Sequence, residues 1–342
     1  MATLACSASS GGAPANTGGR PPGSGGSKAS PPGGATSDGT NDASGGSGTG
    51  ATMLDGPIAR GDFCVLEFGG MFFQVNWKIG GRVTSAKAGQ KELLTNASVN
   101  AINYGSTFWT APQSDWNWPP VAEIDSAAYE VSADAISCTL VGPPVTSRSG
   151  VVSGISITKK FSADLAKQAI VAEYTLKNAS SAPKKLAPWE ITRVAPGGLT
   201  FYASDSAPMK AGTRPLLPTT SGGGIYWFKH DANTPLESKL NADGKGWIAH
   251  VSPENAVLIK TFPDIQQGQA ADGEGEVEIY ANTNATAANA YVEVENQGAY
   301  SQIAAGASLT WAVRWYLRTL PANIPATPGN ADLVAFVTEA IK

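Results

Sequence analysis

Short runs in which every second residue is apolar follow one another from residue 53 to residue 320, and glycine, asparagine or proline separates them. The clearest run is the last, in which the apolar residues of one parity are Leu309, Trp311, Val313, Trp315 and Leu317. A period of two places such residues on one face of a β-strand. Turn signals recur at spacings typical of antiparallel sheets. The pattern therefore predicts an all-β protein, built as one large antiparallel β-sandwich over residues 53–320.

A single short helix is expected in the C-terminal tail, residues 321–342. The segment 329–341 reads NADLVAFVTEAIK, in which Asn330 is of a type that caps the first turn of a helix. The apolar residues of this segment recur at helical spacing. They are Leu333, Val334, Phe336, Val337 and Ile341.

Residues 1–52 have a different composition from the rest of the chain. From residue 7 to residue 50 the chain is almost entirely Gly, Ser, Ala, Pro, Thr and Asn, and it lacks large apolar residues. Such a segment cannot bury enough surface to offset its chain entropy, so we expect a disordered tether. The order of a small residue, Cys6 and a polar tether resembles the lipidation site of bacterial lipoproteins, although the basic region and apolar run of a signal peptide are missing. We expect an extracytoplasmic protein of the periplasm or cell envelope, attached to the membrane through a lipidated Cys6; that Cys6 is incidental stays open.

The charge and the titratable residues exclude several classes of function. The net charge is −4 and the pI is near 5.3, so nucleic acid is not an expected partner. Only two histidines occur, His230 and His250, and no cysteine spacing is of the metal-binding type, so no metal is expected. No glycine loop for phosphates precedes a helix, so no organic cofactor is expected either. Cys64 and Cys138 lie in strand-like runs, either as buried apolar residues or as a disulfide. We expect a monomer.

A stretch rich in tryptophan and proline, residues 103–120, reads NYGSTFWTAPQSDWNWPP. Its three prolines disfavour a regular helix or a central strand, so a loop is predicted. Aromatic rings among amides and hydroxyls suit a site that stacks on a sugar ring and hydrogen-bonds its substituents. Alternatively, the loop closes one end of the sandwich and its indoles fill the core. The candidate substrate-binding residues here are Asn103, Tyr104, Trp109, Gln113 and Trp116.

Two carboxylates share one strand face in the run YVEVENQ, residues 291–297. Tyr291, Glu293 and Glu295 lie on one side and the valines on the other. Neighbouring carboxylates repel each other, which raises one pKa toward a value useful for proton transfer. The alternative is a solvated outer face. The similar run of glutamates at 274, 276 and 278 is predicted to be an exposed hairpin, because glycine and aspartate surround it.

Four further residues are candidates for the site. Arg193 shares a strand face with Trp189, opposite Glu190, and can bind a sugar carboxylate or pair with a structural acid. Lys229 and His230 follow an aromatic strand; His230 can act as a general acid or be an ordinary surface residue. Arg82 follows a glycine pair. His250 is interpreted as structural.

Several strings of the sequence resemble a known superfamily. GGRVTSAKAGQKELLT, residues 80–95, resembles the opening of the galactose-mutarotase-like superfamily. More closely, residues 103–120, PWEITRV at 188–194, YWFKHD at 226–231 and YVEVENQG at 291–298 resemble, in that order, the uncharacterised family DUF4380. This resemblance covers nearly all of residues 60–320. It implies a β-supersandwich that binds carbohydrate on the concave face of one sheet.

The resemblance can be carried over at single positions. Glu295-Asn296-Gln297 matches the late E-x-Q motif of aldose epimerases, which implies that Glu295 is the base. Glu190 occupies the region where that family has the histidine that acts as the general acid. Asn103–Ser106 occupies the region of the family's L-H-G-G motif, so neither of the two histidines of the family is present here. The expected function is therefore carbohydrate binding, with proton transfer of the mutarotase or epimerase kind by Glu295 and by Glu190 or His230. The alternative is a non-catalytic sugar-binding or structural lipoprotein of the cell envelope.

Overall fold

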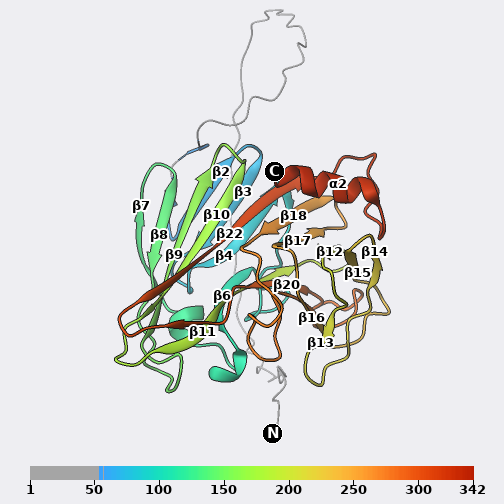
Figure 1. Ribbon diagram of the computed structural model, residues 1–342. Helices are drawn as coiled ribbons and strands as arrows, with labels where there is room; N and C mark the ends of the chain where they lie inside the picture. Colours follow the sequence, from blue (N-terminus) through green and yellow to red (C-terminus); the bar gives the residue numbers. More distant parts are fainter. Residues whose placement is uncertain (1–53, 57) are drawn as a thin grey trace, which may run out of the picture. The chain divides into compact units, whose positions relative to one another are not determined.

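The computed structural model describes residues 54–56 and 58–342, and these form two large antiparallel β-sheets (Figure 1). The predicted all-β sandwich with a short C-terminal helix is confirmed, and the four-residue helix α1 (Ala122–Asp125) was not predicted. The predicted tether, residues 1–52, and with it Cys6, lies outside the described residues.

The first sheet has 12 strands. In spatial order these are β1 (Ala59–Arg60), β2 (Phe63–Phe68), β3 (Met71–Asn76), β4 (Arg82–Ala88), β6 (Ser106–Ala111), β11 (Lys184–Val194), β20 (Val292–Gln297), β19 (Val277–Ala281), β16 (Ser238–Ala242) and β13 (Met209–Lys210), while β5 (Lys91–Glu92) pairs with β4 and β21 (Ser301–Ile303) with β11. The order places β11, from the middle of the chain, next to β20, from near its end.

The second sheet has 10 strands. In spatial order these are β14 (Thr220–Gly222), β15 (Ile225–Lys229), β12 (Leu199–Ala203), β17 (Trp247–Val251), β18 (Ala256–Thr261), β22 (Ser308–Thr319), β10 (Ala169–Asn178), β9 (Ile155–Asp164), β8 (Ser137–Val141) and β7 (Glu130–Ala133). The longest of them, β22, is the run that the alternation predicted most clearly.

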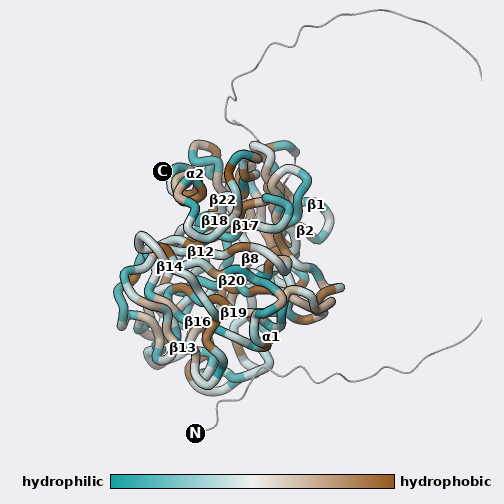
Figure 2. Tube along the Cα trace, turned by 90° about the vertical axis from the view of Figure 1, so that its right-hand side faces the viewer, coloured by the Kyte–Doolittle hydropathy of each residue, from teal (hydrophilic) through white to brown (hydrophobic). Residues whose placement is uncertain are grey.

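The two sheets pack face to face around one apolar core. Trp311, Val313 and Trp315 of β22 all lie in this core, as their shared parity predicted. The ring of Trp315 meets Phe73 of β3 edge to face, with 5.2 Å between ring centroids. Figure 2 shows the resulting alternation of hydrophobic and hydrophilic residues along the strands. The period of two therefore determines which residues fill the space between the sheets.

A two-residue hairpin joins β2 to β3. Phe68 pairs with Met71, so only Gly69 and Gly70 form the turn, with φ angles of 56° and 75°. Both angles lie in the left-handed region, which glycine adopts without steric cost. The glycine pair is therefore a connection within the sheet.

Cys64 of β2 and Cys138 of β8 form a disulfide, with 6.3 Å between their Cα atoms. The two cysteines belong to different sheets. The alternative that the sequence left open, two unpaired buried thiols, is excluded. The bond links the sheets across the core.

The C-terminal helix α2 (Ala331–Ala340) covers the outer face of the 10-stranded sheet. The side chain of Asn330 accepts a hydrogen bond from the backbone N–H of Asp332 at 3.0 Å, which confirms the predicted cap. Leu333 and Val337 are fully buried in a second apolar cluster, together with Trp227 of β15. Within the described part of the chain, no helix is long and apolar enough to span a membrane.

One predicted loop is partly a strand. Residues 106–111 form β6, in the middle of the 12-stranded sheet between β4 and β11. The prediction was wrong there because Pro112 comes directly after the strand, where its missing N–H costs no ladder hydrogen bond. The remainder holds the short 3₁₀ helix Gln113–Asp115 and turns. Trp109 is therefore a strand residue with a fixed orientation.

Candidate functional site

The two faces of β11 carry different chemistry. Glu190 and Thr192 point between the sheets, since Lys260 of the 10-stranded sheet contacts both. Trp189 and Arg193 alternate with them and point to the other side. We call this side of the 12-stranded sheet, which faces away from the 10-stranded sheet, the distal face.

Glu190 belongs to the core. Its carboxylate pairs with the Lys260 ammonium at 2.7 Å and accepts a hydrogen bond from the Tyr174 hydroxyl, and all three side chains are fully buried. Burial lowers the pKa of Lys260, and the attraction of Glu190 opposes this shift. Glu190 and Glu295 therefore do not face one common site, and their predicted pairing as acid and base is corrected.

Polar and aromatic side chains gather on the distal face of four neighbouring strands, β6, β11, β20 and β19, with β16 beside them. The distal cluster, as we call it, consists of Trp109, Trp189, Arg193, Lys239, Glu274, Glu278, Glu293, Glu295 and Gln297. Pairing in register brings Arg193 opposite Glu293, and Glu278 opposite Glu295. The late glutamate strand and the tryptophan of β6 thus meet on one face.

Glu295 is held through one of its two carboxylate oxygens. Its Oε2 accepts a hydrogen bond from the Trp189 indole Nε1 at 2.9 Å and lies 3.3 Å from the Lys239 Nζ. Its Oε1 is buried and accepts no hydrogen bond from an N–H group or hydroxyl of the described residues, but the carboxylate lies within hydrogen-bonding reach of the Glu278 carboxylate, so the two can share a proton. Oε2 therefore fixes the position of the carboxylate.

The pKa of Glu295 lies near neutrality. Burial raises the pKa, the Lys239 ammonium lowers it and the neighbouring Glu278 raises it, and together they bring it to about 7. Burial lowers the pKa of Lys239, but attraction to Glu278, whose Oε2 lies 2.5 Å from Nζ, and to Glu295 raises it above its ordinary value. Glu295 can accordingly exchange a proton near pH 7, while Lys239 stays charged.

Arg193 is ion-paired, but one of its N–H donors has no acceptor in the described chain. Its Nε donates to Glu293 Oε1 at 2.8 Å and its Nη1 to Thr107 Oγ1 at 2.7 Å. The guanidinium lies 5.1 Å from the ring of Trp109. Its Nη2 is buried with no hydrogen-bond partner in the described chain. A ligand oxygen would satisfy this donor.

Lys239 and Glu293 are partly exposed members of the distal cluster. Their side chains are 16% and 13% exposed, whereas those of Arg193 and Glu295 are 0% and 1% exposed. A ligand would therefore meet Lys239 and Glu293 first.

A second polar group adjoins the cluster through Trp109. The indole Nε1 of Trp109 donates to Asp125 at 2.8 Å, and Asp125 pairs with Arg82 at 3.1 Å. The guanidinium of Arg82 also lies 4.4 Å from the ring centroid of Tyr104 and donates to the carbonyl of Ile102 at 2.6 Å. Arg82 and Tyr104 therefore lie at the border of the cluster.

Three other predicted binding residues are placed around this region. Trp116 is buried, packs on Trp109 at 5.5 Å and donates its indole N–H to the carbonyl of Thr110. The backbone N–H of Gln113 donates to Glu274, and that of Asn103 donates to Asn100. Both indoles are buried among apolar residues, as the alternative interpretation held, and Trp109 is at the same time a member of the distal cluster.

His230 and Lys229 lie at the end of β15, in the other sheet. His230 is buried, its Nε2 bonds the carbonyl of Thr283 at 2.8 Å, and its Nδ1 accepts from the N–H of Gly197. Burial lowers its pKa. Lys229 is exposed and donates to the carbonyl of Gly197. None of these hydrogen bonds reaches the distal cluster, and His250 bonds Thr200 in the core.

Sequence reasoning missed five members of the distal cluster: Trp189, Lys239, Glu274, Glu278 and Gln297. The prediction of an exposed hairpin was wrong for Glu276 and Glu278, which are 1% exposed. The sequence did show that Glu276 and Glu278 alternate and so share one strand face. The sequence did not show that the side chain of Glu278 lies in the distal cluster.

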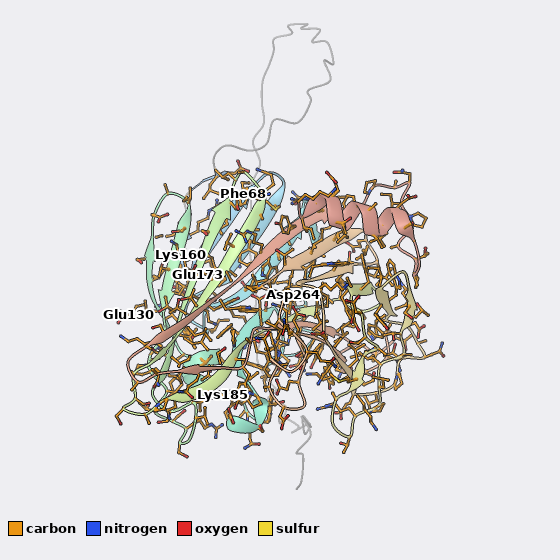
Figure 3. All side chains as sticks on the ribbon, in the orientation of Figure 1. Phe68, Glu130, Lys160, Glu173, Lys185 and Asp264 are labelled. Carbon is orange, nitrogen blue, oxygen red and sulfur yellow. A yellow bond between two sulfur atoms is a disulfide. The ribbon has the colours of Figure 1, made fainter. Side chains whose placement is uncertain are left out.

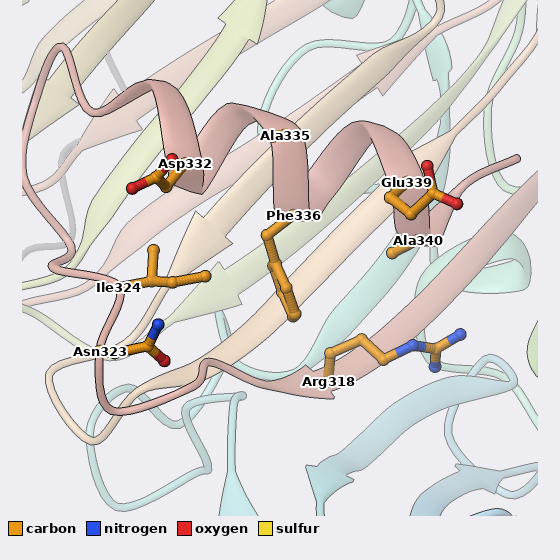
Figure 4. A pocket seen from close by; sticks show the side chains of 8 residues that line it. All are labelled: Arg318, Asn323, Ile324, Asp332, Ala335, Phe336, Glu339 and Ala340. Carbon is orange, nitrogen blue, oxygen red and sulfur yellow. The ribbon is translucent and has the colours of Figure 1, made fainter.

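A surface pocket of about 640 Å³ lies elsewhere, between α2 and the end of β22 (Figure 4). Phe336, Arg318 and Glu339 are among the residues that line it. No residue that the sequence analysis singled out for the site borders this pocket. In the described ranges, no three His, Cys, Asp or Glu side chains are arranged to hold a metal ion.

Solved structures share this fold. A galactose mutarotase-like protein from Lactobacillus casei is similar with a TM-score of 0.55, over 75% of this chain and 100% of its own, at 11% identity. A galactose mutarotase related enzyme from Lactobacillus acidophilus has a TM-score of 0.54, over 76% and 98%, at 9% identity. A putative aldose 1-epimerase from Escherichia coli has a TM-score of 0.52, over 75% and 99%, at 13% identity. Neither a protein-family model nor a curated protein matches the sequence, so the likeness establishes the fold, and the closer resemblance to DUF4380 is unsupported.

Proposed function

We propose that the protein binds a carbohydrate in the distal cluster and that Glu295 moves a proton on the bound sugar, as in a mutarotase or epimerase. The single observation that carries this proposal is the state of Glu295: one oxygen is held by Trp189 and Lys239, and the pKa of the buried carboxylate is raised to about 7. The similarity in fold to mutarotase-like and epimerase-like proteins supports it. Aromatic side chains beside fixed polar groups commonly line the binding sites of sugars.

The proposed reaction is opening of the sugar ring at its anomeric carbon. Glu295 Oε1 takes the proton of the anomeric hydroxyl, the bond between the anomeric carbon and the ring oxygen breaks, and a carbonyl forms. The unpartnered Arg193 Nη2 donates a hydrogen bond to the ring oxygen as charge develops there. The proton held on Glu295 then passes to that oxygen, and reversal on the other face of the carbonyl gives the second anomer.

A non-catalytic sugar-binding protein is the second candidate. The observation that favours it is the position of both histidines, whose hydrogen bonds lie outside the distal cluster. Binding alone needs no general acid beside Glu295.

We also propose an extracytoplasmic location with attachment through Cys6. The Cys64–Cys138 disulfide supports this location, because such bonds persist in oxidising compartments. Labelling cells of the native host with an alkyne fatty acid tests the anchor: incorporation in the wild type and none in Cys6→Ser is expected. Equal labelling of both would contradict it.

Two measurements test the function. Titration with hexoses, uronates and oligosaccharides should change the fluorescence of Trp109 and Trp189, and no response to any sugar would contradict the proposal. The rate of exchange between anomers, followed by NMR, should be higher with the wild type than without protein. This rate should fall about 10²–10⁴-fold in Glu295→Gln. The matched control is Glu173→Gln, on β10 of the other sheet (Figure 3). Sugar binding with equal exchange in all three proteins would leave the second candidate.

A further inference from the structure

The distal cluster contains more negative than positive charge. Its cations are Arg193 and Lys239, and both are already ion-paired, with Glu293 and Glu278 respectively. Its carboxylates are Glu274, Glu278, Glu293 and Glu295. With every group ionised, four carboxylates and two cations leave an excess of two negative charges. Lys239 already serves both Glu278 and Glu295.

Buried side-chain oxygens that accept no hydrogen bond from an N–H group or hydroxyl belong to the cluster or adjoin it. They are Glu295 Oε1, Gln297 Oε1 and, on the adjoining strand β16, Asn241 Oδ1. The amide of Gln297 lies within the cluster, because its Nε2 donates to Glu274 at 2.6 Å and to Glu278 at 3.2 Å. Asn241 pairs in register with Glu278 and so shares its face. Gln297 and Asn241 are 0% and 3% exposed.

On these grounds we propose that the ligand of the distal cluster is an amino sugar with a free, protonated amine, bound between Glu278, Gln297 and Asn241, so that Glu295 Oε1 is left for the anomeric hydroxyl. This inference rests on the proposed function and names the substrate class of that site. An ammonium group donates three hydrogen bonds, accepts none and carries the missing positive charge. The single spare donor, Arg193 Nη2, is left for a hydroxyl or ring oxygen of the same sugar.

The protonation of the four carboxylates agrees with this assignment. Burial raises the pKa of Glu274, Glu278 and Glu293, and that of Glu295 to about 7. The charged groups that act on Glu295 are Lys239 and Glu278 beside it, Glu274 and Glu293 on the same face, and Lys260 from the other sheet. An ammonium group would displace a proton shared by these carboxylates, so binding should release protons near pH 7.

A panel of four monosaccharides tests the inference on the wild-type protein. Calorimetry at pH 7 should give about tenfold or tighter binding of glucosamine than of glucose, because the amine adds charge-assisted hydrogen bonds. N-Acetylglucosamine, which lacks the charge, and glucuronate, which adds a negative charge, should bind no better than glucose. In buffers of different ionisation enthalpy, glucosamine should release protons and glucose should not.

Variants locate the amine. Glu278→Gln keeps the side-chain shape and should reduce the preference for glucosamine to less than about threefold, while Glu130→Gln, on the edge strand β7 of the other sheet (Figure 3), should keep it. Equal affinities for glucosamine and glucose, or tighter binding of glucuronate, would overturn the inference and leave the proposed function standing. Failure of all four sugars, and of the wider panel above, would overturn the proposed function itself. If Glu278→Gln does not fold, the wild-type panel and its proton release still decide.

Discussion

At the scale of single residues, the state of Glu295 determines a pH dependence. Its pKa is raised to about 7, so the carboxylate that accepts a proton is populated above this pH and lost below it. We expect the rate of anomer exchange to rise between pH 5 and pH 9 with a midpoint near the pKa of Glu295. NMR exchange measurements across this range check it, and Glu295→Gln should abolish the dependence. A rate that is constant from pH 5 to pH 9 in the wild type would contradict it.

The buried pair of Glu190 and Lys260 leads to a prediction about stability. Lys260→Met leaves the Glu190 carboxylate buried without its cation, which should lower the free energy of unfolding by about 3–5 kcal/mol. The double variant Lys260→Met, Glu190→Leu should lose less than the single one, because no uncompensated charge remains. Urea denaturation of both measures this difference. A double variant less stable than Lys260→Met would show that the pair itself is strongly stabilising.

At the scale of elements, α2 depends on its cap. Asn330→Ala removes the side-chain oxygen that accepts the N–H of Asp332, and it should destabilise the helix by about 1 kcal/mol. Asn330→Asp keeps an acceptor oxygen and is the matched control. Hydrogen exchange at the amides of Leu333 and Val337 reports the change locally. Equal exchange in Asn330→Ala and the wild type would mean that packing against the sheet alone holds the helix.

Elements with a strong apolar period were predictable from the sequence, whereas β6, which was interpreted from its neighbouring prolines, was not. The alternation of β22 and the capped stripe of α2 were confirmed because burial on one face determines both patterns. β6 was predicted as a loop because Pro112 was taken to exclude a strand that ends just before it. The parity of β20 placed Glu293 and Glu295 together correctly. The sequence could not show that the same face is buried, because which face a loop covers depends on tertiary packing.

At the scale of the whole molecule, the Cys64–Cys138 disulfide links the two sheets. It closes a loop with a sequence separation of 74 residues, which in the chain-entropy description stabilises the folded state by about 4 kcal/mol. The double variant Cys64→Ser, Cys138→Ser should therefore unfold at markedly lower urea concentration than the wild type. Adding a reductant should lower the wild-type midpoint and leave that of the double variant unchanged. A midpoint of the oxidised wild type equal to that of the variant would contradict this prediction.

The strand β11 also limits how this protein can change in length. Glu190, on one face of the strand, forms a salt bridge with Lys260 between the sheets. Arg193, on the other face, pairs with Glu293 in the distal cluster. Inserting or deleting one residue between Glu190 and Arg193 would turn one of the two groups to the wrong side, whereas a change of two residues would preserve the sides. Libraries of this protein should therefore tolerate insertions freely in exposed turns, and within β11 only in even numbers, if at all.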